Sequence, residues 1–384
     1  MHTPDPHELV ISAKTGRVRQ AGADLDEGAQ IIAWREAAER SLYFFAKVIG
    51  NSPYLHPPLH GWLCHRLQYR GTAAVPETRK LILIPRKHAK SRIVSQCLPP
   101  HILIQPKESN CYFPGKVGAD TRILLCGENG TMIESQMRVI MSFFEANSLF
   151  RALWPHVIWP NPNRDAKLWN AKQFIVNRPT AFADPSVRAL GADSTVTGSR
   201  TDVQIKDDLI SREAAESPAV MAKAISFHIS TKPLQENILE SLEFILGTRW
   251  APGDLYEYIE TNEPSIAVYA RKIIENGQAI WPSHFPPAVI EALRAETKEL
   301  FWLNYMNEST HGSLVDFNPD HLRYWTAAAH GTFAFDDDPR DAALAALAGT
   351  AVAIEPPPPP LTPLSTAALT KALGREEFLR MKYA

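Results

Sequence analysis

A lysine and a serine in the first third of the chain stand where a phosphate-binding loop would place them. Residues 81–84 form an apolar run typical of a buried strand, and a basic loop and a helical pattern follow it. In this order of elements, backbone N–H groups of the loop and the positive end of the helix surround phosphate groups. Lys90 would reach the β- and γ-phosphates of a nucleotide, and Ser91 would bind Mg²⁺.

The loop departs from the general pattern G-x-x-x-x-G-K-[ST] at both glycines. Ile84 occupies the first glycine position and Ala89 the second. If position 89 requires a positive φ, the Cβ atom of alanine costs about 1 kcal/mol or more there. A basic surface loop between a strand and a helix is therefore the alternative interpretation of these residues.

A pair of carboxylates follows another apolar run, at residues 203–205. Asp207 would bind Mg²⁺ through water, and Asp208 would orient and polarise the attacking water. We expect their strand to lie beside the strand of the phosphate loop. Most such enzymes have glutamate in the second role, and aspartate is one methylene shorter; a misplacement of about 1 Å can cost on the order of a hundredfold in rate. The alternative for the pair is a solvated turn.

The composition is that of an ordinary globular protein. The chain has 384 residues, 45% hydrophobic and 21% charged, with a formal net charge of -2. This balance excludes a global basic field, so contacts with nucleic acid would need local patches. The four cysteines form no metal-binding cluster, and the sequence shows neither a signal peptide nor an apolar run of about 18 residues. We therefore expect a cytoplasmic protein without a membrane segment.

Short apolar runs alternate with helical patterns through the middle of the chain. Such an alternation predicts an α/β fold with a mostly parallel central sheet and helices on both faces. Residues 169–176 are expected to form a hairpin. The expected strands are residues 81–84, 123–126, 203–205 and 244–247, and the expected helices are residues 31–48, 91–104, 131–146, 214–226 and 291–305.

Taken together, these motifs resemble the ATPase domain of the large subunit of tailed-phage terminases. Pro85 and Arg86 after an apolar strand are similar to the start of that family's deviant P-loop. The similarity covers roughly residues 35–325, and its specificity lies in the set of motifs. Further matching segments are residues 55–62, near the adenine; 197–202 with the aspartate pair; 245–250 and 253–255, the coupling motif; and 279–285 and 301–307, the final helical region.

The resemblance implies a P-loop NTPase fold of the RecA-like (ASCE) type that uses ATP and Mg²⁺. It implies that Thr248 senses the γ-phosphate, where an ordinary strand-end hydroxyl is the alternative. It also implies that Arg86 stabilises charge on the transferring phosphoryl group. Arg200 and Arg249 are candidate arginine fingers that would act within or between subunits, with surface ion pairs as the alternative.

The resemblance also implies which residues surround the nucleotide. Besides Lys90 and Ser91, the loop residues expected to contact it are Arg86, Lys87, His88, Ala89 and Arg92. The residues expected near the adenine are His56, His60 and Trp62. The alternative for these last residues is that they pack a helix against the sheet.

Three regions are expected along the chain: a flexible N-terminal arm (1–28), a P-loop ATPase domain with a late helical region (29–325) and a C-terminal segment (326–384). The last region contains an Ala/Leu-rich helical pattern, a run of five prolines at residues 356–360, and a short terminal helix at residues 366–382.

Full-length terminase large subunits carry an RNase H-like nuclease domain. Residues 332–339 resemble its opening strand, and Asp336, Asp337, Asp338 and Asp341 invite a metal assignment. The residues that follow are too few for a nuclease core of ordinary size. Nuclease activity is therefore not expected in this chain.

The function implied is that of an ATP-hydrolysing motor that translocates double-stranded DNA into a viral procapsid in the host cytoplasm. The expected partners are double-stranded DNA, the portal protein, the terminase small subunit and like subunits in a homo-oligomeric ring. The alternative is a catalytically degenerate P-loop protein that acts as a DNA- or portal-binding packaging subunit. Ala89 and Asp208 motivate this alternative.

Overall fold

The computed structural model describes residues 9–11, 18–20, 23–24, 27–196, 198–309, 325–327 and 333–335. The chain divides into two compact units, residues 1–309 with Ala384 and residues 310–383. The first unit holds an eight-stranded sheet. The second contains an antiparallel pair of short strands, β14 (Trp325–Ala327) and β15 (Phe333–Phe335). The candidate site residues all belong to the first unit.

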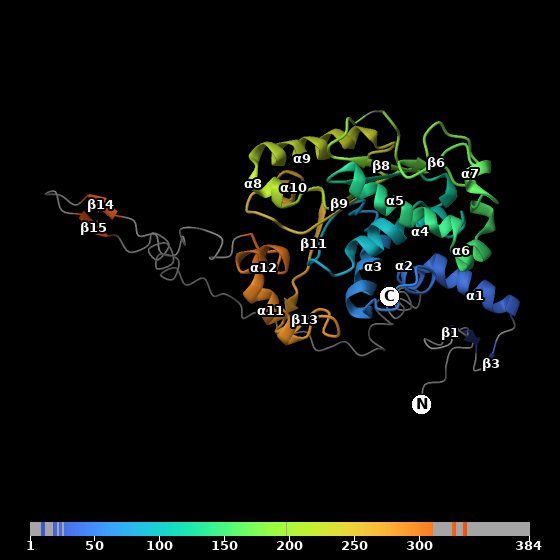
Figure 1. Ribbon diagram of the computed structural model, residues 1–384, viewed down its shortest axis with the longest axis horizontal. Coiled ribbons are helices and arrows are strands. Elements are labelled where there is room, and N and C mark those ends of the chain that lie inside the picture. Colours follow the sequence, from blue (N-terminus) through green and yellow to red (C-terminus); the bar gives the residue numbers. More distant parts are fainter. Residues whose placement is uncertain are drawn as a thin grey trace. The chain divides into compact units, whose positions relative to one another are not determined.

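Eight strands form the central sheet (Figure 1). Its order is β11-β4-β10-β9-β5-β8-β7-β6, in which β11 to β8 are parallel and β7 and β6 are antiparallel. Every residue of β5, β9 and β10 is buried, as expected where helices cover both sides. The strands are β4 (Arg79–Leu83), β5 (Ile123–Gly127), β6 (Trp169–Asn170), β7 (Gln173–Phe174), β8 (Val187–Gly191), β9 (Val203–Asp207), β10 (Leu242–Gly247) and β11 (Ala267–Ala270).

The predicted α/β fold with a mostly parallel sheet is confirmed, but one expectation about strand order is wrong. β10 lies between β4 and β9. The strand that ends in the aspartate pair, β9, is therefore not the neighbour of β4, which precedes the phosphate loop. Ile245 of β10 is in register with Leu81 on one side and with Lys206 on the other. β10 is thus an additional strand between the two strands that carry the predicted motifs.

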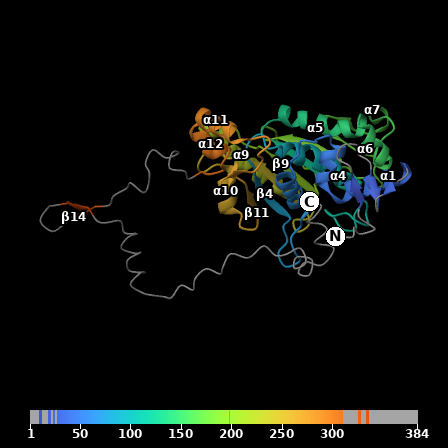
Figure 2. The same cartoon turned by 90° about the horizontal axis from the view of Figure 1, so that it is seen from below.

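Helices cover both faces because successive residues of each strand point to opposite sides. Ile82 and Phe244 face one core cluster, to which α5 (Gly130–Glu145) contributes. Leu81 and Ile245 face another, to which α9 (Pro218–Thr231) and α10 (Leu255–Asn262) contribute. A third cluster joins α11 (Pro287–Thr297) and α12 (Glu299–Asn304). Figure 2 shows these two helices as one group, apart from α5 and α6 (Ser148–Leu153).

The predicted helices are present, several of them with breaks that have a local cause. In the first, Ser41 has a φ of -127° and its side chain accepts a hydrogen bond from Phe44 N. In the last, Lys298 separates α11 from α12 with a φ of 49°. The first helix is α1 (Glu27–Arg40), α2 (Leu42–Phe44) and η1 (Phe45–Ile49); the second is η3 (Arg92–Cys97) and α4 (Leu98–Leu103); α8 (Arg212–Glu216) precedes α9.

Other elements were not predicted from the sequence. β8 was not predicted because Arg188 interrupts its apolar pattern. β11 was not predicted because it is an edge strand whose residues are half-buried or exposed. The predicted N-terminal arm contains β1 (Leu9–Ile11), β2 (Val18–Gln20) and β3 (Ala23–Asp24). The remaining elements are η2 (Pro57–Gly61), α3 (Trp62–Gln68), η4 (Gly118–Asp120), η5 (Pro155–Val157), α7 (Pro162–Asp165), η6 (Lys232–Leu234), β12 (Ile274–Glu275) and β13 (Gln278–Ala279).

Some predictions concern parts of the chain that the structure does not describe. The helices expected at residues 342–353 and 366–382 and the proline run lie outside the described residues, as does Thr197 of the predicted acidic motif. The hairpin expected at residues 169–176 is confirmed by the antiparallel pair β6 and β7. In the described ranges, no helix has the length and apolar character needed to cross a membrane.

A buried network of charged side chains joins the middle strands to α9 and α10. Lys206 of β9 and Glu243 of β10 are fully buried, with their Nζ and Oε1 atoms 2.6 Å apart. Arg79 of β4 lies 2.7 Å from the same carboxylate, and His228 of α9 forms a 2.7 Å hydrogen bond with Glu263. Burial alone would raise the pKa of Glu243, but the positive charges of Lys206 and Arg79 outweigh it and lower this pKa to about 2. One ionised carboxylate thus connects β4, β10 and β9.

Glu243→Gln tests this network, because it removes the charge that compensates the fully buried Lys206. An uncompensated buried charge costs roughly 3–5 kcal/mol, and the free energy of unfolding in urea should fall by about that amount. Glu216→Gln breaks an exposed pair with Arg212 and serves as the control; it should cost less than about 0.5 kcal/mol. Equal small losses for both variants would contradict the role given to Glu243.

The lowered pKa of Glu243 also predicts how stability changes in acid. Because the folded pKa of about 2 lies below the ordinary value of 4.5, the carboxylate stabilises the folded state above pH 4.5, and this contribution is lost as pH falls toward 2. Urea midpoints measured from about pH 6 down to about pH 3 should therefore decline less steeply for Glu243→Gln than for the wild-type protein. Parallel declines would show that Glu243 is not held ionised by its neighbours.

Candidate functional site

Loops after β4, β10 and β9 meet at one edge of the sheet. Residues 84–91 follow β4, residues 248–254 follow β10, and Asp208 follows β9. Because neighbouring parallel strands end at the same edge, these loops lie side by side, and Ile84 N donates a hydrogen bond to the carbonyl oxygen of Gly247 at 3.4 Å. In open α/β sheets, ligands bind beyond the carboxyl ends of the strands. This edge is therefore the candidate site.

The loop after β4 has the backbone conformation of an anion-binding site. Lys87 and Ala89 have φ values of 62° and 56°, while the intervening His88 keeps a negative φ. Alternation of this kind turns successive backbone N–H groups toward one concave side, as in phosphate-binding loops. Position 89 thus has the positive φ that the sequence analysis considered. The loop adopts this shape without the glycines that usually permit it.

The ammonium group of Lys90 brings the three loops together. Its Nζ atom donates a 2.8 Å hydrogen bond to Thr248 Oγ1 and lies 3.0 Å from Asp208 Oδ1. Lys90 and Thr248 are 158 residues apart in the sequence, and both are buried. The fold thus brings together Lys90, Thr248 and Asp208, which the sequence analysis predicted to belong to one nucleotide site.

Asp207 is buried beneath the loop, and one of its oxygens lacks a hydrogen bond. Oδ2 accepts a 2.6 Å hydrogen bond from Ser95 Oγ, whereas Oδ1 has no partner among the described residues. Burial and the negative charge of Asp208 raise the pKa of Asp207 to about 6, against the opposing effects of Lys90 and of the Ser95 and Ser91 hydroxyls. A cation beyond the free oxygen would stabilise the ionised form. Asp207 and Ser91 therefore fit the predicted Mg²⁺ site.

This donor set suits Mg²⁺ that is shared with a nucleotide. In the described part of the chain, no group of three or more His, Cys, Asp or Glu side chains is placed to hold a metal ion. Mg²⁺ at phosphate sites needs only one or two protein ligands, because phosphate oxygens and water supply the others. The acidic run at residues 336–341 lies outside the described residues.

Asp208 combines an unusual backbone with access to solvent. Its φ is 45°, a left-handed conformation that aspartate tolerates better than most residues. Its side chain is 28% exposed while that of Lys90 is 9% exposed. Asp208 therefore contacts both the buried ammonium and bulk water, as a residue that orients an attacking water must do.

His88 and His60 are closed to solvent and support the loop. The ring of His88 stacks on Phe285 with centroids 4.3 Å apart, and His60 Nε2 lies 3.3 Å from the carbonyl oxygen of His88. Burial lowers the pKa of each histidine to about 4, so both are neutral at pH 7. The structure places His60 in the packing role, without an exposed ring face for an adenine, and leaves His88 only its backbone for a nucleotide.

The other residues expected near the adenine are partly accessible. Trp62 is half-buried, and its ring lies 4.7 Å from the guanidinium carbon of Arg271. His56 is also half-buried, and its backbone N donates a 2.6 Å hydrogen bond to His60 Nδ1. The first contact ties α3 to the segment after β11, and the second is local to the start of η2, in agreement with the packing alternative.

Arg86 and Lys87 form the exposed rim of the loop. The guanidinium carbon of Arg86 lies 4.6 Å from the centre of the Trp250 ring, and Nη1 donates a 3.2 Å hydrogen bond to Asn304 Oδ1. These contacts keep the guanidinium at the mouth of the site. Neither cation has to leave a buried position to meet a phosphate group.

Arg92 does not place its side chain in the site. Nε donates a 2.8 Å hydrogen bond to Ser52 Oγ, and Nη2 donates to the carbonyl oxygen of Gly50. Gln96 accepts a further bond from Nη1 at 2.7 Å. The guanidinium thus fastens η3 to the N-terminal helices, and the prediction that it contacts the nucleotide is not supported.

The two candidate arginine fingers are held in ion pairs. Arg249 is buried and pairs with Glu260 and, at 3.6 Å, with Asp254. Arg200 pairs with Glu236 at 3.4 Å and precedes β9, whereas Asp207 ends that strand. A strand of five residues separates the two ends by roughly 17 Å. Arg200 therefore stands at the opposite edge of the sheet from Asp207, which does not support a finger acting within its own chain; a finger acting between subunits stays a prediction.

A close contact between β10 and α10 shapes the loop that carries Thr248. A Cβ atom on Gly247 would lie 1.9 Å from Tyr256 Cζ, so only glycine fits at the end of β10. Asp254 caps α10 by accepting a 3.0 Å hydrogen bond from Tyr256 N, and it accepts another at 3.0 Å from Trp250 N. The predicted coupling motif is thus a tight turn that links the strand end directly to a helix.

Several residues of the site were not predicted. Ser95 follows Ser91 by one helical turn, and this spacing is a signal that could have identified it. Phe285 and Asn304 come from the late helical region and reach the loop across most of the chain; Asn304 is 218 residues from Arg86. No local sequence pattern predicts such contacts, because they depend on the tertiary fold.

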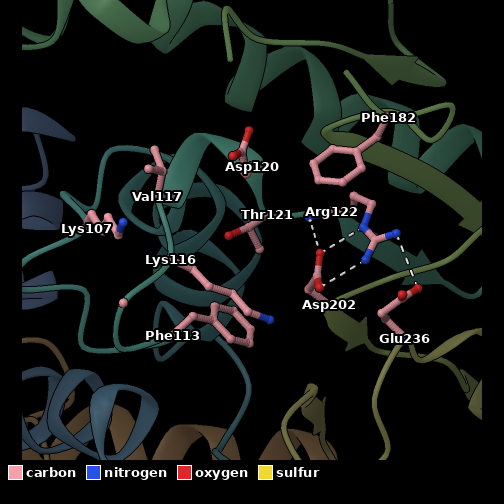
Figure 3. A pocket seen from close by; sticks show the side chains of 11 residues that line it. Lys107, Phe113, Lys116, Val117, Asp120, Thr121, Arg122, Phe182, Asp202 and Glu236 are labelled. Carbon is pink, nitrogen blue, oxygen red and sulfur yellow. Dashed lines mark hydrogen bonds and ion pairs between the residues drawn. The ribbon is translucent and has the colours of Figure 1, made fainter. Parts of the chain in front are cut away.

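A pocket of about 420 Å³ lies elsewhere, at the amino edge of the sheet (Figure 3). Its Arg122 precedes β5 and its Asp202 precedes β9. Arg122 Nε lies 2.9 Å from Asp202 Oδ2, and Nη1 lies 3.4 Å from Glu236 Oε2, and Figure 3 shows these partners beside Phe182. The charges of Arg122, Asp202 and Glu236 pair with one another, and this pocket is distinct from the candidate site.

The chain has an α/β fold with a mostly parallel sheet, and the loop after β4 has the backbone conformation of an anion-binding site. Comparison with known proteins found similarity to phage large terminases among solved structures. The crystal structure of the HK97 bacteriophage large terminase shares 15% identity, with a TM-score of 0.39, over 61% of this chain and 47% of that chain. The Thermus phage P74-26 large terminase ATPase domain shares 14% identity, with a TM-score of 0.39, over 64% of this chain and 96% of that one.

The chain thus spans about half the length of the HK97 protein that it matches. No protein-family model matches the sequence, and no curated protein matches it. The evidence for the roles of individual residues therefore comes from the geometry of the site.

Ala89→Gly tests whether the loop is strained in the folded state. An alanine in the left-handed conformation destabilises the folded state by about 1–2 kcal/mol. Glycine relieves this strain, but its greater chain entropy stabilises the unfolded state by about 0.4–1 kcal/mol. The free energy of unfolding should therefore rise by about 0.5 kcal/mol. Ala222→Gly, in the exposed middle of α9, should lower it by about 1 kcal/mol. Destabilisation by both changes would show that Ala89 is not strained.

Proposed function

We propose that this chain binds ATP with Mg²⁺ at the edge formed by β4, β10 and β9 and hydrolyses it. One observation carries the proposal: the buried Lys90 of a loop with alternating φ lies 2.8 Å from Thr248 Oγ1 and 3.0 Å from Asp208 Oδ1. A basic surface loop, the alternative, would leave its lysine in water. A buried lysine between a carboxylate and a hydroxyl, beneath a concave row of N–H groups, suits a nucleoside triphosphate.

The positions of the side chains suggest what each does. Backbone N–H groups of the loop, together with Lys90, would hold the β- and γ-phosphates. Ser91 and Asp207 would hold Mg²⁺, which would neutralise charge on the phosphate oxygens. Asp208 is open to solvent and would orient the attacking water and accept its proton. Phosphate that attracts Lys90 competes with its bond to Thr248, so this hydroxyl would register the state of the γ-phosphate.

Arg86 would add positive charge at the γ-phosphate from the rim. Its guanidinium is exposed and, among the described residues, contacts the Trp250 ring and Asn304. A cation in this place stabilises the charge that develops on the transferring phosphoryl group. Lys87 lies beside it on the same exposed rim.

We propose further that ATP hydrolysis here drives packaging of double-stranded DNA into a viral procapsid in the host cytoplasm. The order of motifs along the chain and the turn that joins Thr248 to α10 support a motor of the terminase type. In this role the chain would act in a homo-oligomeric ring with the portal protein and the terminase small subunit.

The alternative is a P-loop protein that binds DNA or portal and has lost turnover. The left-handed backbone of Ala89 and of Asp208, where ATPases commonly have glycine and glutamate, favours this alternative. In that case ATP would bind to the site with Mg²⁺ and would not be hydrolysed. The two functions therefore share one site and differ only in the chemical step.

Lys90→Ala tests both functions on the full chain, with DNA and portal protein present. The substitution removes a charge-stabilising donor and should lower kcat by about 100-fold or more. Lys107→Ala, at an exposed position near the other edge of the sheet, should change kcat by less than about twofold. ATP binding is measured in parallel by calorimetry.

The outcomes separate the alternatives. Hydrolysis by the wild-type protein that Lys90→Ala abolishes supports the ATPase. Binding of ATP and Mg²⁺ that depends on Lys90, without hydrolysis, supports the degenerate protein. Hydrolysis that is equal in wild-type and Lys90→Ala protein, or absence of nucleotide binding, would contradict the proposed site.

A further inference from the structure

Asn304, the last residue of α12, contacts two of the loops that form the site. Its backbone carbonyl accepts a 3.1 Å hydrogen bond from Arg86 N, and Oδ1 accepts one from Arg86 Nη1 at 3.2 Å. Nδ2 donates to the carbonyl oxygen of Arg249 at 3.4 Å. The residue is 3% exposed. One buried amide thus joins the phosphate loop to the loop that carries Thr248.

The end of α12 is also fixed to the sheet by bonds that do not involve this amide. The carbonyl oxygen of Tyr305 accepts a 2.8 Å hydrogen bond from Ile273 N, and Arg271 N donates to the carbonyl oxygen of Leu83 at 2.9 Å. Leu83 ends β4, directly before the phosphate loop. Asn304 therefore presents its donor and acceptor from a firm position beside the ends of β4 and β10.

The two loops need such a support because their side chains would act on the same phosphoryl group. Resting on the proposed function, we infer that Asn304 is a positioning residue for ATP hydrolysis: it sets Arg86 and the backbone next to Thr248 in one fixed arrangement. It acts through Arg86 and through the backbone of Arg249. A displacement of about 1 Å between them would be enough to slow the chemical step on the order of a hundredfold.

The amide group is suited to this role because it offers an acceptor and a donor at once. Asn304→Asp keeps the acceptor for Arg86 and loses the donor for the Arg249 carbonyl. Asn304→Ala loses both and keeps the backbone bond to Arg86 N. The two variants therefore separate the support of Arg86 from the link between the loops.

Steady-state kinetics of the full chain, with DNA and portal protein, test the inference. Asn304→Ala should lower kcat by about 10- to 100-fold and change the KM for ATP by less than about threefold. Asn304→Asp should have an intermediate kcat. Combined with Arg86→Ala, the alanine substitution at position 304 should lower kcat much less than it does alone, because it acts partly through Arg86.

Asn307→Ala is the matched control. Asn307 is also buried, and its Nδ2 donates a 2.8 Å hydrogen bond to a backbone carbonyl, that of Arg271. Its side chain forms no hydrogen bond with either loop among the described residues, so its substitution should lower Tm without lowering kcat more than about twofold. A kcat that is unchanged in Asn304→Ala, or lowered equally in Asn307→Ala, would overturn the positioning role.

Hydrogen exchange gives a measurement that does not depend on ATP hydrolysis. In the nucleotide-free protein, Asn304→Ala should raise the exchange rates of residues 85–91 and 249–253 about tenfold, and Asn307→Ala should not. Unchanged exchange in both segments would overturn the inference. Lack of ATP hydrolysis by the wild-type protein would overturn the proposed ATPase, and the exchange experiment would still test the link between the loops.

Discussion

An ammonium group removed from water needs partners of opposite charge or good hydrogen-bonding acceptors, and that of Lys90 organises the site. Its partners, Asp208 and Thr248, come from different strands. They can meet it only because β10 lies between β4 and β9 and all of these strands end at one edge. Strand order, loop conformation and residue types are therefore linked by the position of one charge.

The loop that places Lys90 is strained, and its surroundings hold it in place. Ala89 and Asp208 both occupy left-handed conformations, which persist only where neighbouring structure determines them. The stacking of His88 on Phe285 and the bonds from Asn304 to Arg86 supply this support. The late helical region, which contributes no group to phosphate chemistry, thus contributes to the shape of the site.

The sequence was informative where local patterns govern structure. Continuous apolar runs identified the buried parallel strands, and Lys90, Asp207, Asp208 and Thr248 were placed together as the motifs predicted. Strand order was not predictable locally, so the position of β10 was missed. The same limitation applies to Arg200, which motif order placed near the nucleotide although the strand direction carries it to the other edge. Some ion-pair partners, such as Glu243 for Lys206 and Glu263 for Arg79, lie far away in the sequence and have no local signal.

The central claim is that the loop after β4 binds the phosphates of ATP through Lys90. A structure of the full chain with a non-hydrolysable ATP analogue and Mg²⁺ tests it most directly. The account predicts Lys90 Nζ at about 2.7–2.9 Å from a β- or γ-phosphate oxygen, and Ser91 Oγ at about 2.0–2.1 Å from Mg²⁺ with Asp207 beyond a bound water. An analogue bound at another place, or a loop whose N–H groups turn away from the phosphates, would contradict it.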